Sequence, residues 1–194
     1  MRGIIGHRGL PGVALGVQNG LRVVSPCDAW CQMVSSLDLD EAIVAGDGLV
    51  GWPHPLATLD DLDTAIERFG RRPGARRIAD ARPHIREWSA SPRETLLRLA
   101  TLRAGYPDAE LNGLIVLSSG RRTHGDLVYR KYKILLEYDG EQHRLDGGQF
   151  ATDVKRLNDF SEDGWIVIRV VRHTSEREAL ARLDRALRSR GWTR

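Results

Sequence analysis

The chain has few cysteines, few lysines and no long apolar run. Only two of its 194 residues are cysteine, and aromatic residues make up 6%, which argues against a small secreted fold held together by disulfides. No segment approaches the roughly 18 apolar residues that cross a bilayer, and residues 1–8 lack the apolar core of a signal peptide. We therefore expect a cytoplasmic protein that has no contact with membranes.

The two cysteines, Cys27 and Cys31, also lack a spacing that would point to chemistry. Three residues stand between them on an expected helix, whereas redox motifs and zinc knuckles place two residues between their cysteines. We expect two small thiols in the interior.

The charge is distributed unevenly along the chain. Residues 1–90 carry 10 basic and 11 acidic residues, and residues 91–194 carry 19 and 15, for net charges of −1 and +4. A basic second half favours an anionic partner such as nucleic acid. However, only three of the 29 basic residues are lysine, and an excess of arginine also arises in GC-rich genomes.

Helix-start signals predict a mainly helical first domain over residues 1–88. Ser25 followed by Pro26 is typical of a helix start, and Thr58 with Asp61 fits a capping box. A further helix is expected over about 75–87. Residues 88–90 form the expected boundary, after which Ser91 opens a long helix.

The second half, residues 89–194, alternates between helical and strand patterns. This predicts an α/β domain in which helices flank a small mixed sheet, with strand 132–138 at its centre. The expected helices are 91–105, 150–162 and 175–191, the expected strands are 111–118, 126–129, 132–138 and 165–171, and residues 120–125 are expected to form a turn.

Two carboxylates, Asp126 and Glu137, occupy ends of neighbouring expected strands. Glu137 follows three aliphatic residues, where a charge is costly unless it is paired or bound to a metal. If the two strands form a hairpin, the carboxylates meet at one edge and offer hard oxygen ligands to Mg²⁺. The alternative is two carboxylates in water at the strand ends.

The second half also resembles a known superfamily. Its motifs are Ser91–Arg98, Ala104-Gly105-Tyr106-Pro107, Asn112, Gly125-Asp126-Leu127, Glu137-Tyr138-Asp139-Gly140-Glu141-Gln142-His143, Asp153 with Arg156, and Gly164–Val170. These are similar to the PD-(D/E)xK nucleases, and most closely to the very-short-patch-repair-like proteins of actinobacteria. The resemblance covers residues 91–172 and implies a restriction-endonuclease-like fold.

The resemblance also implies a metal site. Asp126 and Glu137 would bind Mg²⁺, with Mn²⁺ as an alternative, and the Tyr138 carbonyl would be a third ligand. Glu94 would reach the metal through water, although it also stands where a capping box led by Ser91 needs a glutamate.

One position departs from the superfamily pattern. Asp139 stands where these nucleases carry a catalytic lysine, and a carboxylate supplies no positive charge. Gln142, His143 and Lys155 are the candidates for a displaced catalytic group. His143 could act as a general base near neutral pH, or it could be a loop histidine with local hydrogen bonds. Lys155 could equally be a solvated helix residue.

Three further charged residues allow structural or functional interpretations. Asp153 and Arg156 are three residues apart on an expected helix, so a surface ion pair is a fair interpretation. Arg169, on a strand, is expected to pair with a buried carboxylate or a phosphate.

These patterns favour an endonuclease that hydrolyses DNA phosphodiester bonds with Mg²⁺ in repair or defence. The alternative is a non-catalytic DNA-binding or regulatory protein, of toxin–antitoxin or phage-defence type, that has kept a degenerate nuclease fold. A third interpretation is an interaction module. DNA is the expected partner, and a homodimer is compatible with these expectations.

Overall fold

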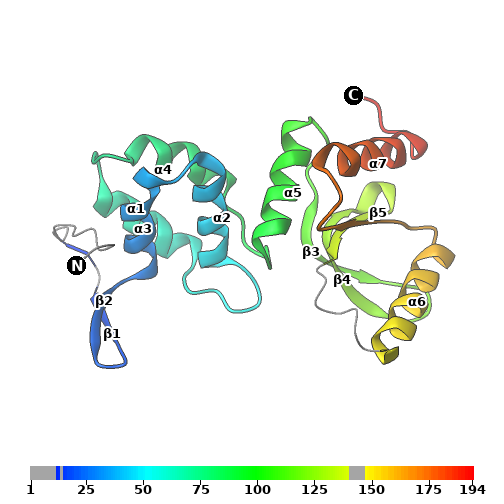
Figure 1. Cartoon of the computed structure of the whole chain (residues 1–194), viewed down its shortest axis with the longest axis horizontal. Helices are drawn as coiled ribbons and strands as arrows, with labels where there is room; N and C mark the ends of the chain where they lie inside the picture. Colours follow the sequence, from blue (N-terminus) through cyan, green and yellow to red (C-terminus); the bar gives the residue numbers. More distant parts are fainter. Residues whose placement is uncertain (1–11, 14, 140–146) are drawn as a thin grey trace. The chain divides into compact units, whose positions relative to one another are not determined.

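The chain forms two compact units, Met1–Glu87 and Trp88–Arg194. The structure is a computed structural model that describes residues 12, 13, 15–139 and 147–194. Figure 1 traces both units, which are described separately below. The sequence analysis placed the boundary at residues 88–90, next to this division.

Within the described residues, the first elements of this unit are a two-stranded antiparallel hairpin, β1 (Leu15–Gln18) and β2 (Leu21–Val24). Four helices follow: α1 (Pro26–Met33), α2 (Leu39–Val50), α3 (Leu59–Phe69) and α4 (Ala75–Ala81). Ser25 caps α1 and Thr58 forms a capping box with Asp61 at α3, which confirms both predicted helix starts. α4 is shorter than expected because Pro83 cannot donate the next helical hydrogen bond, and Arg82–His84 is a 3-10 turn.

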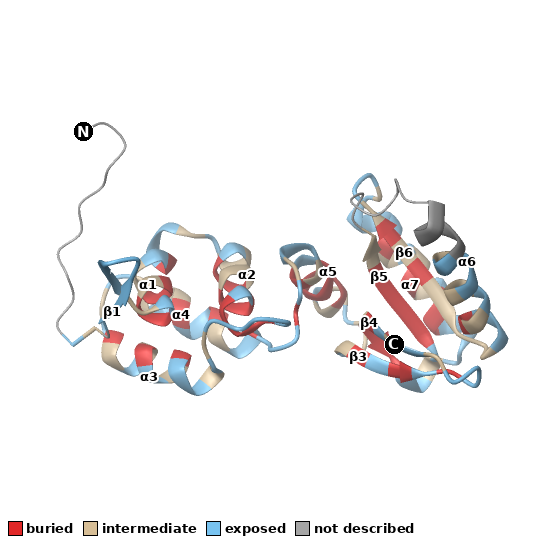
Figure 2. Ribbon diagram, turned by 90° about the horizontal axis from the view of Figure 1, so that it is seen from below, coloured by how far each residue is buried: buried red, intermediate tan, exposed pale blue. Residues whose placement is uncertain are grey.

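The core of this unit is apolar and includes one hydrogen-bonded indole. Trp30, Ile43, Leu62 and Ile85 are almost fully buried, and the buried faces of the helices turn inward in Figure 2. The indole Nε1–H of Trp30 donates to the carbonyl of Ala42 at 2.9 Å, so the buried donor is satisfied. Cys27 and Cys31 are buried free thiols, as expected, and burial raises the pKa of Cys31 to about 12.

The second unit is a mixed sheet with helices on both faces. Its elements are α5 (Pro92–Arg103), β3 (Glu110–Val116), β4 (Arg122–Tyr129), β5 (Ile134–Asp139), α6 (Gly147–Glu162), β6 (Ile166–Val171) and α7 (Glu176–Ser189). The strand order is β3-β4-β5-β6; β3–β4 and β4–β5 are antiparallel, and β5–β6 is parallel. The predicted mixed α/β architecture and the interior position of the strand over residues 132–138 are confirmed.

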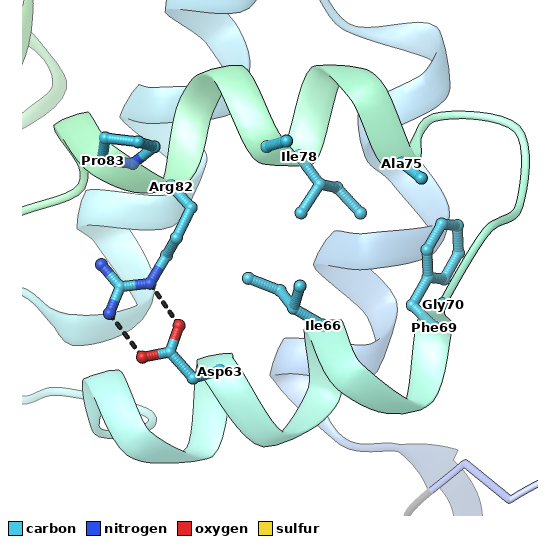
Figure 3. A pocket seen from close by; sticks show the side chains of 9 residues that line it. Asp63, Ile66, Phe69, Gly70, Ala75, Ile78, Arg82 and Pro83 are labelled. Carbon is cyan, nitrogen blue, oxygen red and sulfur yellow. Dashed lines mark hydrogen bonds and ion pairs between the residues drawn. The ribbon is translucent and has the colours of Figure 1, made fainter.

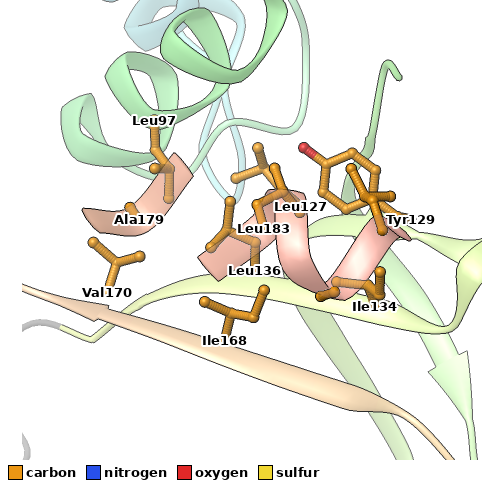
Figure 4. Packing of buried hydrophobic residues seen from close by; sticks show 11 residues of the cluster. Leu97, Leu127, Tyr129, Ile134, Leu136, Ile168, Val170, Ala179 and Leu183 are labelled. Atoms are coloured by element: carbon orange, nitrogen blue, oxygen red, sulfur yellow. The ribbon is translucent and has the colours of Figure 1, made fainter. Parts of the chain in front are cut away.

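Alternate residues of the strands pack on opposite faces of the sheet. Leu127, Leu136 and Ile168 meet Leu97 of α5 and Leu183 of α7 on one face, as Figure 4 shows. On the other face, Val128 and Leu135 meet Phe160 of α6. Glu137 and Arg169 have the parity of this second face, so the sheet places them on the side of α6.

The expected turn over residues 120–125 is wrong from residue 122 onward. Residues 122–125 continue β4 and pair with residues 113–116 of β3. Gly125 is needed for packing, because a Cβ there would lie 2.3 Å from Cδ1 of Leu135. Asp126 therefore lies inside a strand and not at its start.

Candidate active site

Three charged side chains form a row across the sheet. The pairing of β4 with β5 ends at Leu127 opposite Leu136, and Asp126 and Glu137 are the next residues of the two strands. In the parallel pair, Glu137 lies opposite Arg169. The row opens into a cavity of about 160 Å³ lined by Asp126, Glu137, Tyr138, Asp139, Asp153, Arg156 and Arg169. The sequence-predicted pair, Asp126 and Glu137, is thus brought to one cavity.

Asp126 is a half-buried acid whose charge is poorly balanced. Its Oδ2 accepts the backbone N–H of Tyr138 at 2.7 Å. Burial, together with the negative charges of Glu94 and Glu137, raises the pKa of Asp126 to about 7 in spite of that hydrogen bond and of the positive charge of Arg156. A bound cation would relieve this strain on the ionised form.

Glu137 is held by a bidentate ion pair. Nη1 and Nη2 of Arg156 donate to its Oε1 and Oε2 at 3.1 and 2.7 Å, and its side chain is 10% exposed. Burial alone would lower the pKa of Arg156, but the hydrogen bonds and charge of Glu137 more than compensate and raise it. The guanidinium also lies over the ring of Phe160, at 5.2 Å from its centre.

Asp139 is neutralised by the neighbouring strand. Nη2 of Arg169 lies 2.9 Å from Oδ2 of Asp139 and 3.5 Å from Oδ2 of Asp153. Its Nε lies 3.9 Å from Oε1 of Glu137. The prediction that Arg169 pairs with a buried carboxylate is confirmed, and a positive charge does stand beside the position of the missing lysine.

Glu94 has the capping role that its position suggested, and its water-mediated contact with the metal stays a prediction. Its backbone N–H donates to Oγ of Ser91 at 3.3 Å, and its carboxylate accepts from the Ser91 hydroxyl and the Ala90 N–H, both at 2.9 Å. It thus caps α5, and its charge also acts on Asp126.

The remaining predicted site residues contribute less to the described cavity. Lys155 of α6 is exposed and does not line the cavity. Tyr138 lines the cavity and its backbone N–H donates to Asp126, while the role of its carbonyl as a metal ligand stays a prediction. Gln142 and His143 lie outside the described residues.

Arg156 is the cavity residue whose contacts sequence reasoning missed. The interpretation of Asp153 and Arg156 as a simple surface pair was wrong, because Arg156 binds Glu137 and Asp153 faces Arg169. Spacing gave a usable signal, since positions 153, 156 and 160 share one face of a helix and Phe160 is an apolar residue fit for the core. Lys155 falls on another face.

The donor set suits a hard divalent cation with few protein ligands. The cavity holds four carboxylates and two guanidiniums, so its formal charge is −2 when all are ionised. Within the described residues, no group of three or more His, Cys, Asp or Glu side chains is arranged to hold a metal. Mg²⁺ commonly uses one or two carboxylates and completes its shell with water and phosphate. Asp126 and Glu137 fit that pattern, provided that Arg156 leaves Glu137.

A second pocket, in the first unit, has a different character. It lies between α3 and α4, and Ile66, Phe69 and Ile78 give it apolar walls, as Figure 3 shows. The Asp63–Arg82 ion pair, 2.5 Å long, lies along one side. Its charged groups are matched, so it offers no reactive centre.

Comparison with known proteins does not assign the chain to a family. No protein-family model matches the chain, and neither a curated protein nor a solved structure does. Within the described part of the chain, no helix has both the length and the apolar character that a membrane crossing needs.

Proposed function

We propose that this protein is an endonuclease that hydrolyses DNA phosphodiester bonds with bound Mg²⁺, or Mn²⁺ in its place, in repair or defence. The observation that carries the proposal is the half-buried Asp126 beside Glu137, in an open cavity where carboxylates outnumber guanidiniums. The resemblance to the PD-(D/E)xK nucleases supports it, because it selects the same two carboxylates.

The residues of the cavity divide into ligands and charge-balancing groups. Asp126 and Glu137 would hold the metal, which supplies an activated water and stabilises charge on the phosphodiester. The Tyr138 N–H orients the Asp126 carboxylate. Arg169 keeps Asp139 and Asp153 neutralised beside the ligands, so that these acids repel a phosphate less.

The charge balance of the chain supports DNA as the partner. Residues 91–194 carry a net charge of +4, and exposed arginines lie on α7, including Arg177, Arg185 and Arg188. Contacts between such groups and phosphates release counterions. DNA affinity should therefore depend on residues 91–194 and fall steeply between 50 and 200 mM salt, by on the order of 10-fold for each one to two phosphate contacts.

Two features favour the rival function of a non-catalytic DNA-binding or regulatory protein. Arg156 closes on Glu137, and an aspartate stands in place of the lysine. Both functions require DNA binding, and only the endonuclease requires cleavage.

Cleavage of supercoiled plasmid and of labelled single- and double-stranded oligonucleotides, with Mg²⁺ and with Mn²⁺, tests the proposal. We expect metal-dependent cleavage by the wild type, none by Glu137→Gln, and normal cleavage by Asp28→Asn, which alters a buried carboxylate in the other unit. A wild type that binds DNA and cuts none of these substrates with either metal would establish the non-catalytic function.

A further inference from the structure

The guanidinium of Arg156 occupies both oxygens of one proposed metal ligand. Its two terminal nitrogens bind Oε1 and Oε2 of Glu137, and its Nε lies 3.4 Å from Oγ1 of Thr123. A divalent cation needs the same carboxylate oxygens. Arg156 and the metal therefore compete for Glu137.

The other cavity arginine is placed differently. Arg169 is shared among Asp139, Asp153 and Glu137, at 2.9, 3.5 and 3.9 Å. If Arg156 moves away, Arg169 still balances these three acids in part. Arg156 is thus the cation that the cavity can exchange.

A DNA phosphate is a suitable alternative partner for Arg156. The planar guanidinium binds carboxylates and phosphates with the same paired donors. Phe160 is fully buried and provides a fixed surface for the guanidinium, so the group can turn to a new oxygen without leaving the cavity. Glu137, its present partner, and Asp126, the other proposed metal ligand, both line the cavity.

We propose that Arg156 is an internal cation that holds Glu137 until a DNA phosphate draws it away, so that DNA and the divalent metal bind cooperatively. The inference rests on the proposed metal site and adds a phosphate-binding residue to it. By linkage, DNA raises the affinity for metal by the same factor by which metal raises the affinity for DNA.

The test compares Arg156→Gln with a matched control, Arg121→Gln. Arg121 also pairs with an acid of α6, Asp159 at 2.6 Å, but it does not line the cavity. Calorimetry measures the binding of Ca²⁺, which shares the preference for oxygen ligands, to the full-length chain. Fluorescence anisotropy measures the binding of a short labelled DNA duplex with and without Ca²⁺.

We expect Arg156→Gln to bind Ca²⁺ about 10-fold more tightly than the wild type in the absence of DNA, because Glu137 is released. We expect Ca²⁺ to tighten DNA binding by about 10-fold in the wild type and in Arg121→Gln, a typical size for coupling between sites, and to have no effect in Arg156→Gln.

Several outcomes would overturn the inference. They are an unchanged Ca²⁺ affinity in Arg156→Gln, coupling that persists in that variant, or a wild type in which Ca²⁺ does not bind or does not affect DNA affinity. Thermal melting checks that the variants fold. Should Arg156→Gln fail to fold, the test uses Arg156→Lys, which keeps the positive charge and loses the bidentate hydrogen bonds. Its Ca²⁺ affinity and its coupling between Ca²⁺ and DNA should then be intermediate. Values equal to those of the wild type would contradict the proposal. A wild type that shows the coupling and cuts no DNA would refute the endonuclease and leave the role of Arg156 intact.

Discussion

The two units treat buried charge in opposite ways. In Met1–Glu87, the buried Asp28 receives one guanidinium, from Arg68 at 3.0 Å, and the hydroxyl of Ser25 at 2.7 Å. In Trp88–Arg194, four carboxylates share one cavity with two guanidiniums. Asp28 is locally balanced, and the acids of the cavity are not.

This difference separates a structural use of charge from a functional one. A matched buried pair fixes a helix start and then has no capacity for a ligand. Unmatched carboxylates cost stability, and proteins keep such strain mainly at sites where a ligand removes it. The raised pKa of Asp126 marks this cost.

The largest expected effect is on cleavage. Asp126→Ala and Glu137→Ala should each lower Mg²⁺-dependent DNA cleavage by at least about 10³-fold, because each removes an oxygen ligand of the metal that activates water. Initial rates on a plasmid substrate measure the loss.

Asp28→Ala is the control for these two variants, since it deletes a buried carboxylate of the first unit. It should cut DNA at the wild-type rate under conditions where it is folded. Equal losses in all three variants would mean that the contrast between the units is unfounded.

The next effect is a pH-dependent gain in stability for Asp126→Asn. The folded pKa of Asp126 is raised to about 7 by burial and by the charges of Glu94 and Glu137, above an unfolded value of about 3.9. The fold therefore favours the protonated acid, and this stability is present below about pH 4 and is lost as the pH rises through about 7. Asparagine resembles the protonated form at every pH.

Urea unfolding without metal should thus show Asp126→Asn more stable than the wild type at pH 8, by up to about 4 kcal/mol. The difference should almost vanish at pH 4. Saturating Mg²⁺ at pH 8 should raise the stability of the wild type and not of the variant. A variant that is less stable than the wild type at pH 8 would contradict the assigned strain.

A smaller effect is expected from breaking the balanced pair of the first unit. Asp28→Ala leaves Arg68 without its carboxylate and removes an acceptor from Ser25. The side chain of Arg68 is 33% exposed, so water recovers part of the loss, and we expect about 2 kcal/mol of destabilisation in urea unfolding.

Asp63→Ala serves for comparison, because the Asp63–Arg82 pair is more exposed, with 48% of the Asp63 side chain accessible. Its loss should cost less than about 1 kcal/mol. A greater cost for Asp63→Ala than for Asp28→Ala would show that burial does not set the strength of these pairs.

Local signals in the sequence were sufficient for much of the fold. Ser25, Thr58 and Ser91 each begin the helix that they predicted, since a cap depends on residues within one turn. The turn assigned to residues 120–125 was wrong, because Gly125 resembles a turn glycine in sequence and serves instead as the place where Leu135 packs against the backbone. That packing depends on a strand ten residues away.

The same distinction applies to the site. The pairing of Asp126 with Glu137 could be predicted because a hairpin fixes it. The contact of Arg156 with Glu137 could not, because it depends on how α6 lies against the sheet. Periodicity places Arg156 and Phe160 on one face of the helix without showing which strand that face meets.

The smallest expected effect distinguishes two adjacent residues of α6. Lys155 was a candidate for the missing catalytic lysine, but it is exposed, whereas the side chain of Arg156 is 20% exposed. Lys155→Ala removes one positive charge from the surface, so DNA affinity should fall slightly at low salt and recover at 200 mM salt, where exposed charges are screened. At that salt we expect less than a 2-fold change in the cleavage rate and less than about 0.5 kcal/mol in stability.

Arg156→Ala, measured alongside, should lower cleavage at both salt concentrations, because its charge acts inside the cavity. A large loss in Lys155→Ala at 200 mM salt would instead identify Lys155 as the displaced catalytic lysine.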